Sequence, residues 1–188
     1  MKDEAALVDK ALGGDEDAFE QLLYPYRNGM LNIAYQMTGN TEEARDIWQT
    51  AMIKIFKHLK RFRQGKNLKN WLYKIVKNVA NDFYRKKKRD EGLKEEHKKM
   101  GVSAGYSPEK DFLNREIREK IEACLKYLSP REKMVFLLRD AEGFSIKETA
   151  IVMGSSSQSV RTHLCRARRK LRLEFEKIYP KGRWSNEV

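Results

Sequence analysis

Basic side chains crowd the segment between residues 157 and 172, and no acid interrupts them before Glu174. Arginine neutralises phosphates and pairs with base edges, while serine, threonine and glutamine hydrogen-bond to bases. This combination predicts a helix whose first turns face a DNA groove; the alternative is an ordinary solvated surface. The candidate DNA-binding side chains are Ser157, Gln158, Ser159, Arg161, Thr162, Arg166, Arg168, Arg169 and Lys170.

Two capping boxes and two glycines set the elements that would position this helix. Ser129–Glu132 and Ser145–Glu148 each place a serine three residues before a glutamate, a pattern that opens helices. Gly143 and Gly154 follow two apolar runs, and glycine readily takes the left-handed conformation that ends helices. We expect one helix from Pro130 to Gly143 and a second that ends at Gly154.

The basic helix follows after a turn that contains Ser155 and Ser156. Its apolar residues recur at three- and four-residue steps, which puts them on one face and leaves the basic residues on the other. A short helix, a tight turn and a basic helix together indicate a DNA-binding helix-turn-helix. The residues expected on the inner face are Val160, Leu164, Ala167, Leu171 and Phe175.

A second basic stretch runs from Lys60 to Arg89 and contains twelve Lys or Arg residues with a single acid, Asp82. Tyrosines lie among these cations on the expected outward face, and flat rings beside phosphate-binding cations suit unpaired bases. The alternative is an ordinary basic helix with half-buried tyrosines. The candidate residues for binding unpaired bases are Arg63, Gln64, Lys66, Asn67, Tyr73, Lys74, Lys77, Asn78, Asn81, Asp82, Arg85 and Lys86.

Three amphipathic patterns before residue 90 predict a helical bundle. The first contains Pro25, which should kink the helix or divide it at Tyr24, and ends at Gly39. Asn40–Glu43 is a capping pattern for the second helix, and Asn67 can cap the third. The residues expected to face inward are, in order, Phe19, Leu22, Leu23, Tyr26, Met30, Ile33, Ala34 and Met37; Ala44, Ile47, Trp48, Ala51, Met52, Ile55, Phe56 and Leu59; and Leu68, Trp71, Leu72, Ile75, Val76, Val79, Ala80 and Phe83.

Acids gather at the start of the second of these helices, between Glu42 and Asp46. Carboxylates there interact favourably with the helix dipole, so capping alone accounts for them. The alternative is that the exposed side of this helix, with Asp46, Gln49, Ile53 and Lys54, docks a protein partner. The sequence leaves both interpretations open.

After the basic run Arg85–Arg89 the apolar pattern dissolves into alternating charges, glycines and serines that cannot form a core. We therefore expect a flexible linker over residues 89–108. Helix should return at about Pro108, with an apolar stripe that leads into the first capping box. The residues of that stripe are Leu113, Ile117, Ile121, Cys124, Leu125 and Leu128.

The expected fold is all-α, with two small helical domains over residues 1–88 and 109–178 and a tail over residues 179–188. The net charge of +12 favours a polyanionic partner. No apolar run approaches the roughly 20 residues of a membrane span and no secretion signal is visible, so we expect a cytoplasmic protein without membrane insertion. Cys124 looks like core and Cys165 like an exposed thiol; we expect no disulfide, metal or cofactor.

The chain resembles a bacterial RNA polymerase sigma factor of the small extracytoplasmic-function type, over about residues 17–88 and 112–175. Two sites depart from the family pattern. Thr50 stands where the family usually has an acid, and Ser155-Ser156 replaces an apolar residue and a proline. The matching segments are Phe19–Asn40 for region 2.1, Asp46–Gln49 for region 2.2, Phe62–Lys86 for regions 2.3 and 2.4, and Ser129–Gly154 with Ser159–Leu171 for region 4.

The resemblance implies a promoter-specificity subunit of RNA polymerase that is not itself an enzyme. The first domain would dock on the clamp of the largest subunit and capture melted bases of the minus-10 element. The second would contact the flap of the second largest subunit and read the minus-35 element as duplex DNA. An anti-sigma factor would bury both domains and could hold the chain near the inner face of the membrane. The implied polymerase-binding residues are Asp46, Gln49, Thr50 and Ile53.

Two other functions were weighed against this one. A free-standing DNA-binding regulator would need a dimerisation surface or a ligand pocket, and the sequence has no long heptad or spare domain. A helical nucleic-acid-processing enzyme would need a metal or acid–base constellation, and clustered Asp and Glu residues occur only at capping positions. Both are less favoured than a promoter-specificity subunit.

Overall fold

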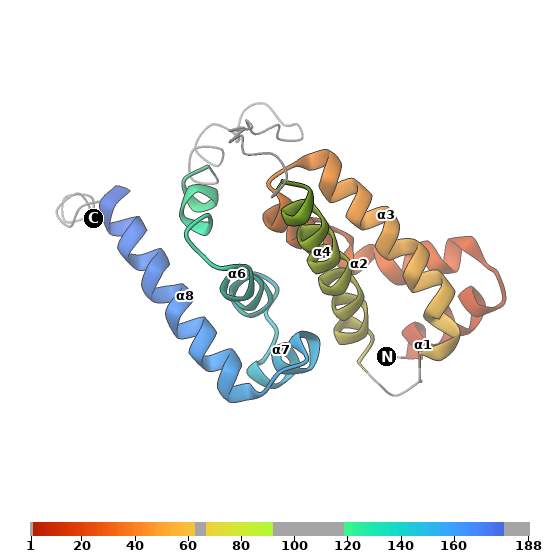
Figure 1. Cartoon of the computed structure of the whole chain (residues 1–188). Helices are drawn as coiled ribbons and strands as arrows, with labels where there is room; N and C mark the ends of the chain where they lie inside the picture. The colour runs from red at the N-terminus through yellow and green to blue at the C-terminus, as the bar shows by residue number, and fades with distance from the viewer. Residues whose placement is uncertain (1, 63–66, 92–118, 179–188) are drawn as a thin grey trace, which may run out of the picture. The chain divides into compact units, whose positions relative to one another are not determined.

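The computed structural model describes residues 2–62, 67–91 and 119–178. The regular elements in these ranges are all helical, and the chain divides into two compact units (Figure 1). The first unit contains the helices before residue 92, and the second contains nearly all the helical residues after residue 118. Within the described ranges, no helix is long and apolar enough to cross a membrane. The predicted all-α class with two helical domains is confirmed.

The first unit is a bundle in which α2 packs against α1, α3 and α4, and α3 packs against α4. The caps predicted at Asn40 and Asn67 are confirmed. The side-chain oxygen of Asn40 accepts hydrogen bonds from the N–H groups of Glu42 and Glu43, and that of Asn67 accepts one from Asn70. The elements are α1 (Lys2–Leu12), α2 (Glu16–Thr38), α3 (Thr41–His58), the short 3₁₀ turn η1 (Leu59–Arg61) and α4 (Leu68–Glu91).

Helix α2 runs through Pro25 without a break, so the expected division at Tyr24 is wrong. Proline removes one hydrogen bond to the carbonyl four residues earlier. Pro25 and Gln21 both lie on the exposed side of the helix, where water can satisfy that carbonyl. The predicted end is confirmed, because Gly39 takes the left-handed conformation with φ of 70°.

Helix α4 continues through the basic run to Glu91, although the linker was expected to begin at residue 89. Lysine and arginine are good helix formers, so an exposed basic run does not end a helix. Lys87 also bonds both carboxylate oxygens of Glu43 on α3, at 2.7 and 2.9 Å, which holds this part of α4 on the bundle. Most of the expected linker lies outside the described residues.

Most residues expected to face inward in the first unit are buried, and the exceptions lie at the edges of the predicted stripes. Phe56 is exposed, so its predicted inward position is wrong. Trp48 and Trp71 are only half-buried. Each of these residues lies at the edge of the apolar stripe of its helix, where burial depends on how much of the stripe the neighbouring helix covers.

The second unit places α6 against α8 around a small core. Leu125, Leu128 and Ala167 are buried together, and Phe136 and Leu171 pack against them. Cys124 is buried and Cys165 is exposed, as predicted, whereas Ile121 and Phe175 are exposed and were wrongly expected to face inward. Leu113 and Ile117 lie outside the described residues. The elements are a helix over 119–125, α6 (Pro130–Phe136), the π-helical segment η2 (Leu137–Ala141), α7 (Ile146–Met153) and α8 (Ser157–Ile178).

Both predicted capping boxes are present in the second unit. The N–H groups of Ser129 and Ser145 donate to the carboxylates of Glu132 and Glu148, each at 2.9 Å. The serine hydroxyls accept in return from the glutamate N–H groups, at 3.3 and 3.2 Å. Because these bonds are local, the two helix starts follow directly from the sequence.

Candidate nucleic-acid interfaces

The turn between α7 and α8 is closed by hydrogen bonds that fix where the basic helix begins. Gly154 has a φ of 64°, and the N–H of Ser155 donates to the carbonyl of Ala150 at 3.0 Å, a common C-cap arrangement. The hydroxyl of Ser156 then accepts from the N–H of Ser159 at 3.1 Å. Ser156 therefore caps α8, at one of the positions where the sequence departs from the family pattern.

Helix α8 buries one face and exposes the other, as its sequence pattern predicts. Val160, Leu164 and Ala167 are buried, while Ser157 and Ser159 at its start are half-buried. Within the described part of the chain, no acid forms an ion pair with the arginines at 161, 166 and 169. The predicted DNA-binding residues that are exposed on α8 are Gln158, Arg161, Thr162, Arg166, Arg168 and Arg169.

Two predicted DNA-binding cations of α8 have acidic partners inside the second unit. Arg168 donates two hydrogen bonds to Asp140, from Nε at 3.0 Å and from Nη2 at 2.6 Å. These bonds raise the pKa of Arg168, so its charge is fixed. Lys170 donates to the carboxylate of Glu132 at 2.7 Å. The pattern that predicted these cations as DNA contacts did not indicate either ion pair.

The carboxylate that binds Lys170 is buried. Glu132 is 5% exposed. Burial by itself would raise the pKa of Glu132, but hydrogen bonds from Lys170 and Ser129 outweigh it and hold the pKa below its usual range. The ion pair between Glu132 and Lys170 connects the start of α6 to the middle of α8, and it therefore orients the basic helix within its unit.

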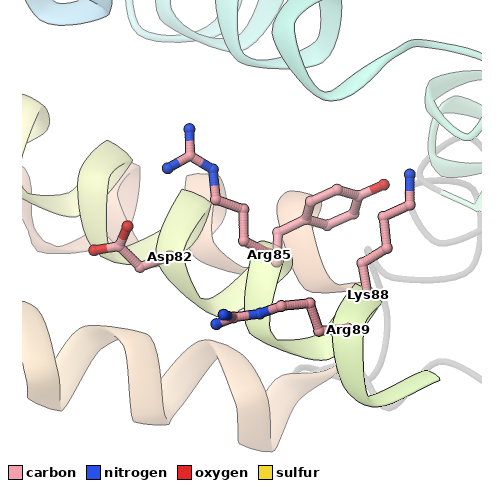
Figure 2. A pocket seen from close by; sticks show the side chains of 5 residues that line it. Asp82, Arg85, Lys88 and Arg89 are labelled. Carbon is pink, nitrogen blue, oxygen red and sulfur yellow. The ribbon is translucent and has the colours of Figure 1, made fainter. Parts of the chain in front are cut away.

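Helix α4 presents a basic outer face in the first unit. Figure 2 shows Asp82, Arg85, Lys88 and Arg89 projecting from this helix. Asn81 is half-buried, and Asn67 is exposed at the cap. Arg63, Gln64 and Lys66 lie outside the described residues. The predicted residues that are exposed along α4 are Lys74, Asn78, Asp82, Arg85 and Lys86.

Two residues predicted on this outer face are buried instead. Tyr73 is 2% exposed, so its ring is not available for stacking on a base, and this prediction is wrong. Lys77 is 9% exposed, which leaves little of it at the surface. The apolar stripe of α4 is wider than one row of residues because α2 and α3 both pack against this helix. Tyr84, the other tyrosine expected on the outward face of this helix, remains partly exposed.

The outer side of α3 is exposed where the sequence predicted a docking strip. Asp46, Gln49 and Thr50 are exposed, and Ile53 is 54% exposed. A groove of about 330 Å³ lies beside this strip, between α2 and α3. The sequence pattern does not indicate this groove, because most of its apolar residues belong to the same stripes as the core. Its lining includes Phe19, Leu23, Tyr24, Trp48 and Met52.

Each of the two helical units has an exposed basic helix face, an arrangement typical of DNA-binding proteins. In the described ranges, no three His, Cys, Asp or Glu side chains come together in a possible metal site. Comparison with family models gives the narrower class. Residues 22–90 match Sigma-70 region 2, and residues 118–171 match Sigma-70, region 4.

The chain belongs to the sigma-70 family, as a sigma factor of the extracytoplasmic-function (ECF) type that directs transcription initiation without catalysing a reaction. It is 28% identical over 173 residues to the ECF RNA polymerase sigma factor SigW of Bacillus subtilis, and the matched residues cover 88% of this chain and 92% of SigW. It is also 28% identical over 170 residues to the RNA polymerase sigma-H factor of Pseudomonas aeruginosa, covering 86% and 88% of the two chains.

Solved structures share the fold. The structure of CnrH in complex with the cytosolic domain of CnrY superposes on this chain with a TM-score of 0.71. The two sequences are 21% identical, and the match covers 93% of this chain and 98% of CnrH. The sigma factor RpoE of Bartonella quintana, in complex with the anti-sigma factor NepR, is 22% identical with a TM-score of 0.72, covering 84% and 96%.

Proposed function

We propose that this sigma factor brings core RNA polymerase to promoters by two separate contacts: α8 reads the minus-35 element as duplex, and α4 captures unpaired bases of the minus-10 element. The observation that carries the proposal is the presence of one exposed basic helix face on each compact unit. The exposed face of α8 suits duplex DNA, and the exposed face of α4 suits unpaired bases.

The minus-35 contact rests on the start of α8. Arg161 and Thr162 lie in its first turns, are exposed, and have the side chains that hydrogen-bond base edges in the major groove. Arg166 and Arg169 lie further along the same face and neutralise phosphates. Arg168 and Lys170 support this contact indirectly, since their partners Asp140 and Glu132 belong to the same unit.

The minus-10 contact rests on the outer face of α4. Lys74, Arg85 and Lys86 supply positive charge along one side of the helix, and Asn78 supplies an amide for base edges. Because Tyr73 is buried, Tyr84 is the tyrosine of this helix that remains for stacking. Arg63, Gln64 and Lys66 precede α4 in the sequence, and we include them in the proposed contact.

Polymerase would bind the outer side of α3. Asp46, Gln49, Thr50 and Ile53 are exposed together, and an exposed isoleucine beside a groove lined by aromatic residues as well as Glu20 and Arg27 favours a protein partner. We assign the clamp of the largest subunit to this strip and the flap of the second largest subunit to the second unit.

An anti-sigma factor would control the chain by covering both units until a signal arrives. The RpoE structure holds a sigma factor with a bound anti-sigma factor, and the CnrH structure holds CnrH with the cytosolic domain of CnrY. The place of action is the cytoplasm, where polymerase and promoter meet, and an anti-sigma factor fixed in the membrane would keep the inactive chain at its inner face.

The test is reconstitution with core RNA polymerase. Purified chain and core enzyme are mixed, and genomic fragments are transcribed in run-off reactions with the start sites mapped. The expected result is a set of starts that share two sequence elements and are absent without the chain. Failure to associate with core enzyme, or initiation that is unchanged on every template, would contradict the proposal.

A further inference from the structure

Asp140 and Arg168 form a two-point contact in the second unit, and this contact uses only one edge of the guanidinium. A guanidinium carries five N–H donors in one plane. Nε of Arg168 donates to Oδ2 of Asp140 at 3.0 Å, and Nη2 donates to Oδ1 at 2.6 Å. The outer edge, formed by Nη1 and the second N–H of Nη2, is left for another acceptor. The side chain of Arg168 is still 55% exposed.

The carboxylate of Asp140 comes from a segment whose backbone is fixed by the core of the unit. Asp140 lies in η2, where the N–H of Glu142 donates to the carbonyl of Leu137, five residues earlier, at 2.9 Å. Leu137 and Leu138 are both buried, so this π-helical turn is anchored. Such turns are rare and occur frequently at functional sites. The side chain of Asp140 is itself only 22% exposed, so Arg168 has a fixed partner before any ligand binds.

The place of Arg168 along α8 brings its outer edge to the backbone of bound DNA. Arg168 follows Arg161 by seven residues, close to two helical turns, so both side chains leave the same side of the helix about 10 Å apart. A helix that enters the major groove by its N-terminal end brings its later turns beside the phosphates. Two parallel N–H groups of a guanidinium match two oxygens of a phosphate.

A long side chain normally loses conformational freedom when it binds phosphate, and this loss lowers affinity. Asp140 has already restricted Arg168 in the unbound protein. We propose that Asp140 is a positioning residue for the minus-35 contact: it holds one edge of Arg168 so that the outer edge is preset to receive a phosphate of the duplex. The inference rests on the proposed binding of duplex DNA by α8, and it gives Arg168 a direct contact in addition to its supporting role.

Two competing accounts of the pair predict different results. If Asp140 only neutralises Arg168, removing the carboxylate adds positive charge beside the DNA and raises affinity. If the pair only holds η2 against α8, affinity is unchanged at any temperature where the variant stays folded. Positioning predicts a loss of affinity in a folded protein, in spite of the gain in positive charge.

The experiment measures binding of holoenzyme, made from core polymerase and the full chain, to a promoter found by the run-off mapping. The temperature is too low for strand opening and lies well below the melting temperature of each variant. Asp140→Asn keeps the size of the side chain, but its amide NH₂ group opposes a donor of the guanidinium. The Kd should rise about three- to tenfold, which is the cost of immobilising one long side chain. The rise should be similar on all promoters, because phosphates carry no sequence information.

Arg168→Lys is a second variant that leaves the net charge unchanged. Lysine can bind Asp140 or a phosphate, but it lacks the planar fork that binds both at once. Its Kd should therefore rise by a similar factor of about three to ten. Adding Asp140→Asn to Arg168→Lys should cause no further loss, because no guanidinium remains to be positioned.

Glu176→Gln is the matched control, since it removes an acid from the exposed pair with Arg172 on the same helix. Its Kd should stay within about twofold of the wild type. Binding by Asp140→Asn that is as tight as the wild type or tighter, or full affinity in Arg168→Lys, would overturn the inference and leave the proposed function standing. A wild-type holoenzyme without affinity for any promoter would remove the proposed function and the inference together.

Discussion

The exposed arginines of α8 differ in what each can do, although the sequence presents them as one basic run. Arg161 lies in the first turns of α8 and, like the next residue Thr162, is exposed, whereas Val160 is buried. Arg169 lies two turns further along the same exposed face. A helix that enters the major groove by its N-terminal end brings Arg161 to base edges and leaves Arg169 at the backbone. The position along the helix therefore predicts the kind of contact.

Replacing Arg161 with Ala should change base preference at one position of the minus-35 element, with a loss of about 1–3 kcal/mol on the preferred base. Replacing Arg169 with Ala should weaken binding on every sequence alike and flatten the slope of log affinity against log salt by about one unit. Binding of the holoenzyme to a panel of promoters, measured at several salt concentrations, distinguishes the two effects. An equal loss on all sequences from Arg161→Ala would contradict its assigned role.

The residues that the sequence assigned correctly are those whose environment is local. Asn40, Ser129 and Ser145 were predicted as caps because their partners lie two or three residues away. Tyr73 and Phe56 were assigned to the wrong side because the width of a buried face is set by neighbouring helices. Helical periodicity gives the direction of a face and does not give its width.

At the scale of elements, the sequence pattern predicts where helices begin and end, whereas long-range ion pairs determine how the helices are oriented against one another. Glu132 at the start of α6 binds Lys170, 38 residues away, and Asp140 in η2 binds Arg168, 28 residues away. Neither pair follows from spacing, since each depends on how α6, η2 and α8 pack together. The same holds for Glu43 and Lys87, 44 residues apart, which extend α4 beyond its apolar pattern.

Helix α1 was missed for a related reason. Its charged residues were interpreted only as evidence against a secretion signal, yet Val8 and Ala11 lie three residues apart and are buried. Gly14 follows with φ of 94°, and the side chain of Asp15 caps α2 by accepting from the N–H of Ala18. Leu7, Val8, Ala11 and Leu12 form an apolar stripe about two turns long, which is too short to predict a stable helix by itself, and packing against α2 supplies the remainder.

Glu132→Gln should destabilise the second unit by about 1–3 kcal/mol, because a hydrogen bond between charged groups is lost while Gln can still accept from Ser129. The lowered pKa of Glu132 gives the pH dependence. Its stabilisation is complete above the unfolded pKa, roughly 4.3, and disappears as the pH falls through the lower folded value. Thermal unfolding of both proteins between pH 3 and 7 measures the difference.

The matched control is Glu176→Gln, which breaks the exposed pair with Arg172 on the surface of α8. Its effect should stay below about 1 kcal/mol because water screens exposed pairs. A Glu132→Gln protein that unfolds at the wild-type temperature at pH 7 would show that the ion pair with Lys170 does not hold α8 in place.

At the scale of the whole molecule, the net charge of +12 is divided between two separate units rather than collected on one surface. Each unit has its own basic helix, α4 in the first and α8 in the second. A chain that joins two such units raises the effective concentration of the second contact once the first has formed. Promoter binding should therefore depend on the covalent connection as well as on either face.

Cutting the chain between the two units tests this dependence. A protease site inserted between residues 101 and 105 leaves the described helices intact, and cleavage after holoenzyme assembly separates the units. On dilution, the cleaved holoenzyme should need about 10²–10⁴ times more protein than the uncleaved control to form open complexes, because joining the units gives an advantage of that size. Open-complex formation across a dilution series measures the shift. Coinciding curves for cut and uncut protein would mean that each unit acts without help from the chain that joins them.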